Sequence, residues 1–140
     1  MTVESSGPAI VREALRPGRD CYTTLLDFAE RFLMKLLQPD SIRLHRLIIG
    51  EAGRFPEIGR IFYTRGPQVV LEQLSAYIRT QMDAGVLRTA DPVQAAMSLI
   101  QLSQVQQSLR LWGVVDGARV EDVGDHAIEA LNLFSRAYAP

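Results

Sequence analysis

Hydrophobic residues recur at intervals of three and four along most of this chain, the spacing of one buried face on an α-helix. The clearest stretch begins after Asp20, a predicted N-cap, and ends before Pro39, because proline disfavours helical backbone in the residue before it. Its predicted buried face contains Tyr22, Leu25, Leu26, Ala29, Phe32, Leu33, Leu36 and Leu37. No segment alternates with a period of two over the length of a strand, so the pattern predicts an all-α fold.

Proline, glycine and aspartate delimit the other predicted helices. Proline suits the first turn of a helix, Gly85 is a predicted C-terminal cap, and Asp91 is a second predicted N-cap. Together these signals predict helices over about 8–15, 20–37, 40–53, 55–63, 66–84, 92–112 and 120–138. We therefore expect a bundle of about six to seven helices.

The predicted helix over 92–112 is unusual because it carries no charge from Pro92 to Leu109, a run of 18 residues that could span a membrane. Eight of the 18 are polar, which is too costly in hydrocarbon, so we expect no membrane span. Neutral polar side chains are easier to bury than charges, so we expect this helix to be covered by its own domain and by a second subunit. The alternative is a central helix buried wholly within a monomer.

Composition narrows the class of protein. The 140 residues include 15 basic and 16 acidic side chains, a net charge of −1 that argues against a free-standing nucleic-acid-binding domain. A single cysteine, Cys21, cannot form an internal disulfide and suits a reducing compartment. The first residues include an early acidic side chain and lack the apolar core of a secretory signal, so we expect a cytoplasmic protein.

Catalytic and cofactor motifs are missing from the sequence. There is no glycine-rich phosphate loop and no HExxH, G-x-S-x-G or CxxC motif, so we expect neither an enzyme nor a cofactor. Asp122, His126 and Glu129 share a helical face, but such a set is more typical of a solvated surface than of a metal site.

Glu51 falls on the predicted buried side of the helix over 40–53, beside Leu44 and Leu47. A buried carboxylate needs a partner or loses much of its solvation. One interpretation is a structural ion pair between Glu51 and Arg54, which we prefer because such pairs are common. The other is that Glu51 and His45 supply polar contacts in a ligand pocket.

The run LHRLIIGEAGRFPEI over 44–58 resembles the R-L-x-x-x-E-x-x-R-F-P-E-L signature of the C-terminal domain of TetR-family transcriptional repressors, particularly the AefR-like group. Further landmarks agree in order and spacing, so the resemblance covers about 20–112. They are Phe62-Tyr63, Gly66-Pro67, Leu74, Gly85-Val86-Leu87-Arg88, Asp91-Pro92 and Ala95-Ala96. The resemblance implies a structural corner made by Glu51, Arg54, Phe55 and Pro56.

The resemblance also implies a dimeric one-component regulator, in which an N-terminal helix-turn-helix binds operator DNA and a C-terminal helical domain binds an effector. Residues 1–19 would be the tail of the connecting helix and residues 20–140 the effector-binding and dimerisation domain. The helix-turn-helix would be absent from this chain. The helices over 92–112 and 120–138 would form a four-helix bundle with those of a second copy.

Our hypothesis is a homodimeric domain in which a small apolar or amphipathic effector controls operator binding allosterically. The residues expected to line the ligand pocket are Phe28, Phe32, Leu47, Glu51, Phe62, Tyr77, Met82, Met97 and Gln101. Those expected at the dimer interface are Gln94, Ser98, Gln101, Val105, Leu109, Trp112, Ala127, Leu131 and Phe134. Two alternatives remain open, namely a stand-alone module that heterodimerises with a full-length regulator and a small-ligand carrier.

Overall fold

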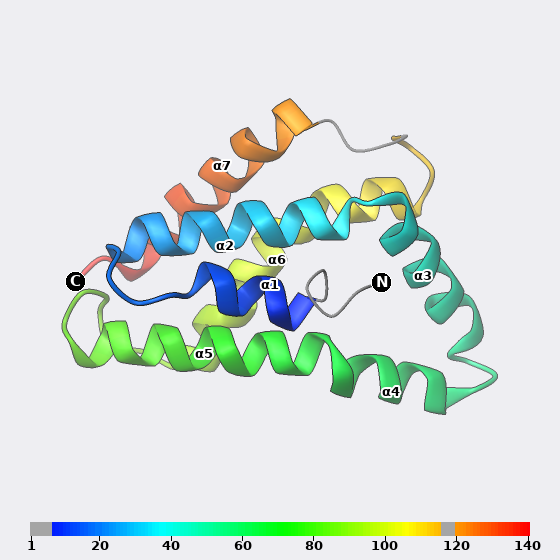
Figure 1. The fold of residues 1–140 in the computed structure, drawn as a ribbon, viewed down its shortest axis with the longest axis horizontal. Coiled ribbons are helices and arrows are strands. Elements are labelled where there is room, and N and C mark those ends of the chain that lie inside the picture. Colours follow the sequence, from blue (N-terminus) through cyan, green and yellow to red (C-terminus); the bar gives the residue numbers. More distant parts are fainter. Residues whose placement is uncertain (1–6, 116–119) are drawn as a thin grey trace.

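The molecule is built from α-helices joined by short loops (Figure 1). The computed structural model describes residues 7–115 and 120–140, and within these ranges it contains α-helices and no strand. The helices are α1 (Gly7–Ala14), α2 (Cys21–Leu36), α3 (Pro39–Glu51), α4 (Pro56–Arg65), α5 (Pro67–Asp83), α6 (Pro92–Leu111) and α7 (Val120–Tyr138). The all-α prediction is confirmed, and the helix bounds differ from the predicted ones by only a few residues.

The predicted caps explain why the helices begin where they do. The side chain of Asp20 accepts a hydrogen bond from the backbone N–H of Thr23 at 2.7 Å, which satisfies a donor at the start of α2. Asp91 does the same for α6, accepting from the N–H of Val93 at 2.9 Å. Four helices also carry a proline in their first turn, as predicted. These are Pro39, Pro56, Pro67 and Pro92.

The end of α5 is a glycine cap, as the sequence predicted. Gly85 has a φ of 74°, in the left-handed region that disfavours other residues. Its N–H donates to the carbonyl of Met82 at 3.1 Å, and that of Val86 donates to the carbonyl of Gln81 at 2.9 Å. This pair of bonds is the Schellman arrangement, which satisfies carbonyls that the helix itself leaves without partners.

The core is organised around α2. In Figure 1, α2 crosses the middle of the molecule, with α7 above it and α1 and α5 below. Phe28 and Leu25 of α2 are buried against residues from the surrounding helices. These partners include Val11, Leu74, Ile78, Leu99, Leu131 and Phe134. Apolar side chains from four neighbouring helices, α1, α5, α6 and α7, therefore share one core with α2.

One residue of the predicted α2 face lies elsewhere. Tyr22 was expected to be buried but is 41 % exposed, and its hydroxyl donates to Oδ1 of Asn132 on α7 at 3.2 Å. The inner positions of the first turn belong to Cys21 and Thr24. The hydrophobic pattern assigned Tyr22 to the buried face because the ring of tyrosine counts as apolar. Its hydroxyl, however, favours a polar partner at the surface, and the buried face of α2 begins at Cys21 instead.

The helices α3 and α4 form an arm at one edge of the molecule (Figure 1). Only Ser41 and Ile42 of α3 are buried, and no residue of α4 is. Leu47, predicted on a buried face, is 59 % exposed. The arm is tied to the body by Arg46, whose guanidinium donates to the carbonyl of Arg110 at 2.6 Å, at the end of α6. The apolar pattern of α3 therefore does not correspond to burial within this chain.

The uncharged helix α6 has an inner and an outer face. Its inner face is buried in the protomer and includes Ala95, Ala96, Leu99, Ser103 and Gln107. On its outer face Val105 is 57 % exposed, which excludes the alternative of a helix buried wholly within the monomer. Across the described ranges, no helix combines the length and apolar character needed to cross a membrane.

Candidate functional site

A cavity of about 540 Å³ opens where the arm meets the body of the molecule. We call it the main cavity. Its volume falls within the range of small-molecule sites, roughly 300–1,000 Å³. The described residues that line it are Gly7, Pro8, Phe32, Lys35, Leu36, Ser41, Leu44, His45, Ile61, Phe62, Tyr63, Arg65, Gly66, Pro67, Val70, Leu71, Met97, Ile100, Gln101 and Gln104. They come from α1 to α6, so the cavity lies where six helices meet.

Helical spacing brings the apolar part of this wall together. Phe32 and Leu36 are four residues apart on α2 and therefore face the same way. Met97 and Ile100 are three residues apart on α6 and line the facing side. The arm contributes Phe62, whose ring is fixed from one side by the imidazole of His45. The result is a mainly apolar cavity with aromatic walls.

His45 is one of the polar groups that the arm contributes to the cavity. Its Nδ1 lies 2.7 Å from the carbonyl oxygen of Ser41, one turn earlier on α3. A carbonyl can only accept, so Nδ1 carries the hydrogen of this bond. The imidazole also meets the ring of Phe62 edge-on, with 5.0 Å between ring centroids. These two contacts fix the ring and leave Nε2 as the nitrogen that is available to a ligand.

Four of the nine residues predicted for the pocket line the main cavity. They are Phe32, Phe62, Met97 and Gln101. Phe28 lies behind the wall, stacked on Phe32 with 5.3 Å between ring centroids. Tyr77 and Met82 belong to the core, further along α5. Leu47 and Glu51 lie on α3 outside the cavity lining.

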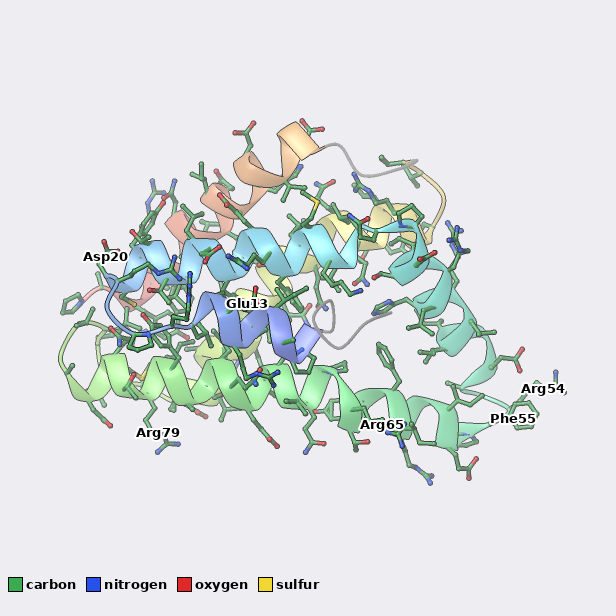
Figure 2. All side chains as sticks on the ribbon, viewed as in Figure 1. Glu13, Asp20, Arg54, Phe55, Arg65 and Arg79 are labelled. Carbon is green, nitrogen blue, oxygen red and sulfur yellow. The ribbon has the colours of Figure 1, made fainter. Side chains whose placement is uncertain are left out.

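The predicted ion pair between Glu51 and Arg54 is absent within the described residues, so this prediction was wrong. Arg54 instead lies over the ring of Phe55, with its guanidinium carbon 5.2 Å from the centroid. Figure 2 shows both side chains at the outer tip of the arm. The carbonyl of Glu51 accepts the N–H groups of Arg54 and Phe55 at 3.0 and 2.8 Å. Backbone bonds followed by Pro56 therefore make the corner, and the half-buried side chain of Glu51 takes no part in an ion pair there.

Several cavity residues were not predicted from the sequence. Gln104 could have been found, because it follows Met97 and Gln101 at helical spacing. Nothing in the sequence marks Lys35 and Arg65 as cavity residues, since basic residues are common near a helix C-terminus for reasons unrelated to ligands. Tyr63 lies next to Phe62 and reaches the cavity from α4. His45, which the second interpretation of α3 assigns to a ligand pocket, lines the cavity.

A second hollow of about 650 Å³ runs along the outside of the molecule between α6 and α7. We call it the α6–α7 groove. It is lined by Gln94, Met97, Ser98, Gln101, Leu102, Val105, His126, Glu129, Ala130 and Leu133. Met97 and Gln101 also line the main cavity, so the two hollows share side chains of α6.

The residues predicted for the dimer interface fall into two groups. Gln94, Ser98, Gln101 and Val105 line the α6–α7 groove, while Leu109 lies further along α6 and the 74 % exposed Trp112 is its C-cap. The three residues predicted on α7 are buried in the core of the protomer. They are Ala127, Leu131 and Phe134. This part of the prediction is corrected, because the apolar seam of α7 packs on its own α2 and α6 and is not available to a partner.

The outer face of α7 carries other side chains. His126, Glu129 and Leu133 line the groove, and Leu133 is exposed. No group of three potential metal ligands comes together in the described part of the chain. Asp122, His126 and Glu129 thus share one helical face without forming such a group.

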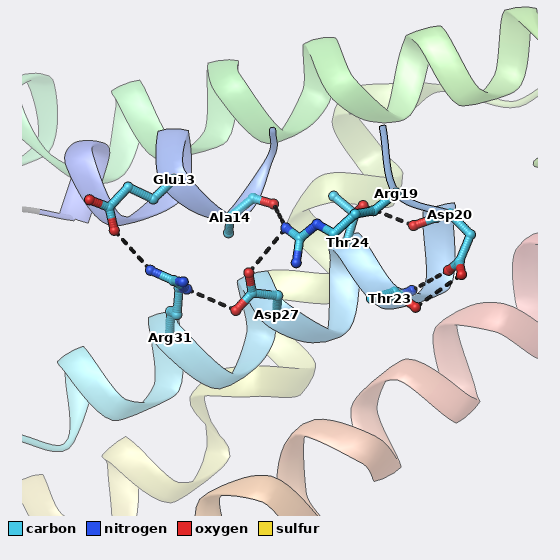
Figure 3. A network of polar contacts seen from close by, with 8 residues as sticks. All are labelled: Glu13, Ala14, Arg19, Asp20, Thr23, Thr24, Asp27 and Arg31. Carbon is cyan, nitrogen blue, oxygen red and sulfur yellow. Dashed lines mark hydrogen bonds and ion pairs between the residues drawn. The ribbon is translucent and has the colours of Figure 1, made fainter. Parts of the chain in front are cut away.

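A polar network joins α1 to α2 (Figure 3). Arg31 bonds Asp27 and Glu13, each at 2.8 Å. Arg19 bonds Asp27 at 3.1 Å and donates to the carbonyl of Ala14 at 2.5 Å, which caps the end of α1. The hydrogen bond with Asp27 is the main reason that the pKa of Arg31 is raised. The network fixes one end of α1, and the other end lines the main cavity.

Cys21 and Tyr77 form a separate, partly buried pair on α2 and α5. Burial raises the pKa of the Cys21 thiol, against a smaller lowering by its hydrogen bond with Tyr77. Burial also raises the pKa of the Tyr77 hydroxyl. A thiol held in its neutral form is a poor nucleophile, so Cys21 acts here as a packing residue.

Comparison with known proteins agrees with this geometry. Residues 23–140 match the family of AefR-like transcriptional repressors over its C-terminal domain. A TetR-family transcriptional regulator from Mesorhizobium loti is 22 % identical over 95 % of this chain, with a TM-score of 0.84. The flavonoid-responsive regulator FrrA is 25 % identical over 96 %, with a TM-score of 0.78.

A TetR-family regulator from Pseudomonas syringae pv. tomato is 22 % identical over 92 % of this chain, with a TM-score of 0.72. The chain spans 66 %, 70 % and 71 % of the lengths of these three proteins. A search of curated proteins found no match.

Proposed function

The chain belongs to the family of AefR-like transcriptional repressor C-terminal domains, and from this premise we propose that it is a homodimeric sensor of a small apolar or amphipathic molecule. Members of this family are regulators rather than enzymes. A regulator of operator DNA works in the cytoplasm, which also suits the reduced Cys21.

The observation that carries this proposal is the pair of hollows that share α6. The main cavity lies on one side of this helix and the α6–α7 groove on the other, and Met97 and Gln101 line both. A molecule bound in the cavity would contact the same side chains that a second subunit would contact in the groove. Binding can shift a conformational equilibrium only through such differential contacts.

The α6–α7 groove is the proposed dimer surface. The outer face of α6 carries no charged residue from Pro92 to Leu109, and Val105 and Leu133 add exposed apolar area. Two copies related by a two-fold axis would place α6 and α7 of each against those of the other as a four-helix bundle. The polar side chains of Gln94, Ser98 and Gln101 would find hydrogen-bond partners across such an interface.

The main cavity is the proposed effector site. Its aromatic walls suit a ligand with a ring system, and the name of the relative FrrA says that it responds to flavonoids, which are aromatic. In a complete regulator, effector binding would change the arrangement of the two subunits. That change would alter the spacing of N-terminal helix-turn-helix domains relative to the operator half-sites.

The test combines light scattering with binding of the uncharged aromatic dye N-phenylnaphthylamine. We expect twice the chain mass of 15.6 kDa at micromolar concentration, and one dye molecule per protomer. Ile100→Trp, which fills the main cavity, should abolish dye binding and leave the dimer intact. A monomer that binds dye would indicate a ligand carrier instead, and equal binding by Ile100→Trp would remove the main cavity as the effector site.

A further inference from the structure

We propose that the effector is an aromatic acid, that is, a ring system carrying a carboxylate or an acidic phenol, held by the basic side of the main cavity. This inference rests on the proposed function and specifies the chemistry of its ligand. It comes from the charges and the one oriented imidazole in the cavity wall.

The charged residues in the described lining of the cavity are Lys35 and Arg65, and no Asp or Glu occurs among these residues. Arg65 ends α4, where Figure 2 shows it close to the start of α5. Its guanidinium forms no ion pair with any residue of the described part of the chain. A guanidinium beside an apolar cavity offers a planar fork of donors to a carboxylate or phenolate, and charge-assisted hydrogen bonds of this kind are among the strongest.

His45 adds a second feature that favours an acidic group. Its Nδ1 is committed to the carbonyl of Ser41 at 2.7 Å, and its ring is held edge-on against Phe62. The remaining nitrogen, Nε2, has no hydrogen-bond partner among the described residues and is not enclosed. Neutral, Nε2 accepts a hydrogen bond from a phenol, and protonated, it donates one to a carboxylate. Both states recognise an ionisable oxygen.

The rest of the wall is less suited to other ligand classes. Phe32, Phe62 and Ile100 offer apolar contact but few hydrogen bonds, which disfavours a sugar or a polar peptide. A cationic ligand would meet Arg65 with no acidic residue in the described lining to balance it. A neutral apolar ligand would fit the walls but would not engage the guanidinium of Arg65. An aromatic acid satisfies both parts.

The experiment compares two dyes with the same ring skeleton. Anilinonaphthalene sulfonate carries one negative charge, and N-phenylnaphthylamine carries none. Binding of each is measured by fluorescence titration and calorimetry for the wild type and for the double variant Lys35→Met, Arg65→Met. We expect the double variant to bind the sulfonate about tenfold more weakly, as the loss of a charge-assisted bond implies. Its affinity for the neutral dye should stay within about twofold.

Three further variants make the result specific. Arg65→Lys keeps the charge and should retain most of the sulfonate binding. Arg79→Met removes a basic residue on α5 outside the cavity lining, further along the helix in Figure 2, and should change neither affinity. Ile100→Trp should abolish binding of both dyes, because it fills the space that they share.

The outcomes separate this inference from the proposed function. If the neutral dye binds in the main cavity and the double variant leaves sulfonate binding unchanged, the acidic ligand is ruled out while the cavity stands. If neither dye binds, or if Ile100→Trp weakens neither, the main cavity is not a ligand site and both proposals fail. Selective loss of sulfonate binding, with Arg79→Met unaffected, supports the inference.

Discussion

At the scale of single residues, Asp20 shows how one side chain sets the start of a helix. Its carboxylate accepts from the N–H of Thr23 at 2.7 Å and from the hydroxyl of the same residue at 3.0 Å. The backbone hydrogen bond is the main cause that lowers the pKa of Asp20 below its usual value of 3.8. A carboxyl whose folded-state pKa is lowered stabilises the fold above its unfolded value, and this contribution disappears as the pH falls through the folded value.

We therefore predict that Asp20→Ala lowers Tm at pH 7, because the N–H of Thr23 loses its cap. The difference from the wild type should shrink as the pH falls below about 3.8, where the unfolded wild type takes up its proton. Thermal unfolding followed by circular dichroism at several pH values measures both effects. Asp20→Asn is the matched control, since its amide oxygen can still accept the hydrogen bond from Thr23. An unchanged Tm for Asp20→Ala at pH 7 would contradict the capping role.

Glu51 and Leu47 mark the limit of inference from single residues. Both occupy positions on α3 where helical spacing indicates a buried face, yet Leu47 is 59 % exposed and Glu51 is only half-buried. Spacing identifies which residues share a face but not what covers that face. His45, on the same helix, reaches the cavity because α4 folds back toward the body and places Phe62 against it. That placement depends on the corner and not on the sequence of α3.

At the scale of helices, the network between α1 and α2 is the best-defined contact. Arg31 bonds Glu13 across the two helices and Asp27 within α2, each at 2.8 Å. The side chains of Arg31 and Glu13 are 38 % and 60 % exposed, so solvent screens their pairing, which is worth roughly 0.2–1 kcal/mol. Its value lies in holding the end of α1 opposite to the one that lines the main cavity.

We predict a coupling free energy of about 0.5 kcal/mol between Glu13 and Arg31, measured by a double-mutant cycle of Glu13→Gln and Arg31→Met in urea unfolding. The coupling should fall when the salt concentration is raised, because both groups are exposed to solvent. Arg79→Met serves as a control for loss of an exposed arginine and should not couple to Glu13→Gln. A coupling free energy of zero at low salt would show that Glu13 and Arg31 lie close together without stabilising the fold.

The helices themselves were the most predictable level of this structure. Caps and breakers such as Asp20, Gly85 and Asp91 act through bonds to their immediate neighbours, so the sequence alone locates them. What covers the apolar face of a helix cannot be located in this way. Ala127, Leu131 and Phe134 form a clear apolar seam on α7, but spacing cannot tell whether a seam packs on its own protomer or on a second one. Here it packs on α2 and α6.

At the scale of the whole molecule, the packing of the α7 seam on α2 and α6 leaves the outer side of α6 as the proposed dimer surface. We predict that Val105→Glu weakens dimerisation by at least about tenfold, because it would bury an unpaired charge in the α6–α7 groove. The fold should be unaffected, since Val105 is 57 % exposed in the protomer. Analytical ultracentrifugation measures the change in dissociation constant.

The control for this variant is Ile49→Glu, which puts the same charge in place of another exposed β-branched residue. Ile49 lies on α3, outside the groove, and the variant should remain dimeric. If Val105→Glu stays dimeric, the subunits associate through another surface. If Ile49→Glu is the variant that dissociates, the exposed apolar side chains of the arm form the interface.

The shared side chains of Met97 and Gln101 lead to a last prediction, that dimerisation and ligand binding are thermodynamically linked. In a dimer both side chains would be held from the groove side, so a ligand in the main cavity would order them at less cost than in a monomer. Monomeric Val105→Glu should therefore bind N-phenylnaphthylamine about fivefold more weakly than the wild type. Ile49→Glu should bind like the wild type.

Linkage also fixes the reciprocal effect, because the same coupling free energy enters both equilibria. Because each dimer would hold two dye molecules, saturating dye should tighten the wild-type dimer by the square of the factor between the dye affinities of the dimer and the monomer, about 25-fold for a fivefold difference. Replacing Gln101 by alanine should reduce both effects together, because it shortens a side chain that lines the cavity and the groove. Equal dye affinity for monomer and dimer would mean that α6 separates the two hollows without connecting them, and control of operator binding would need another route.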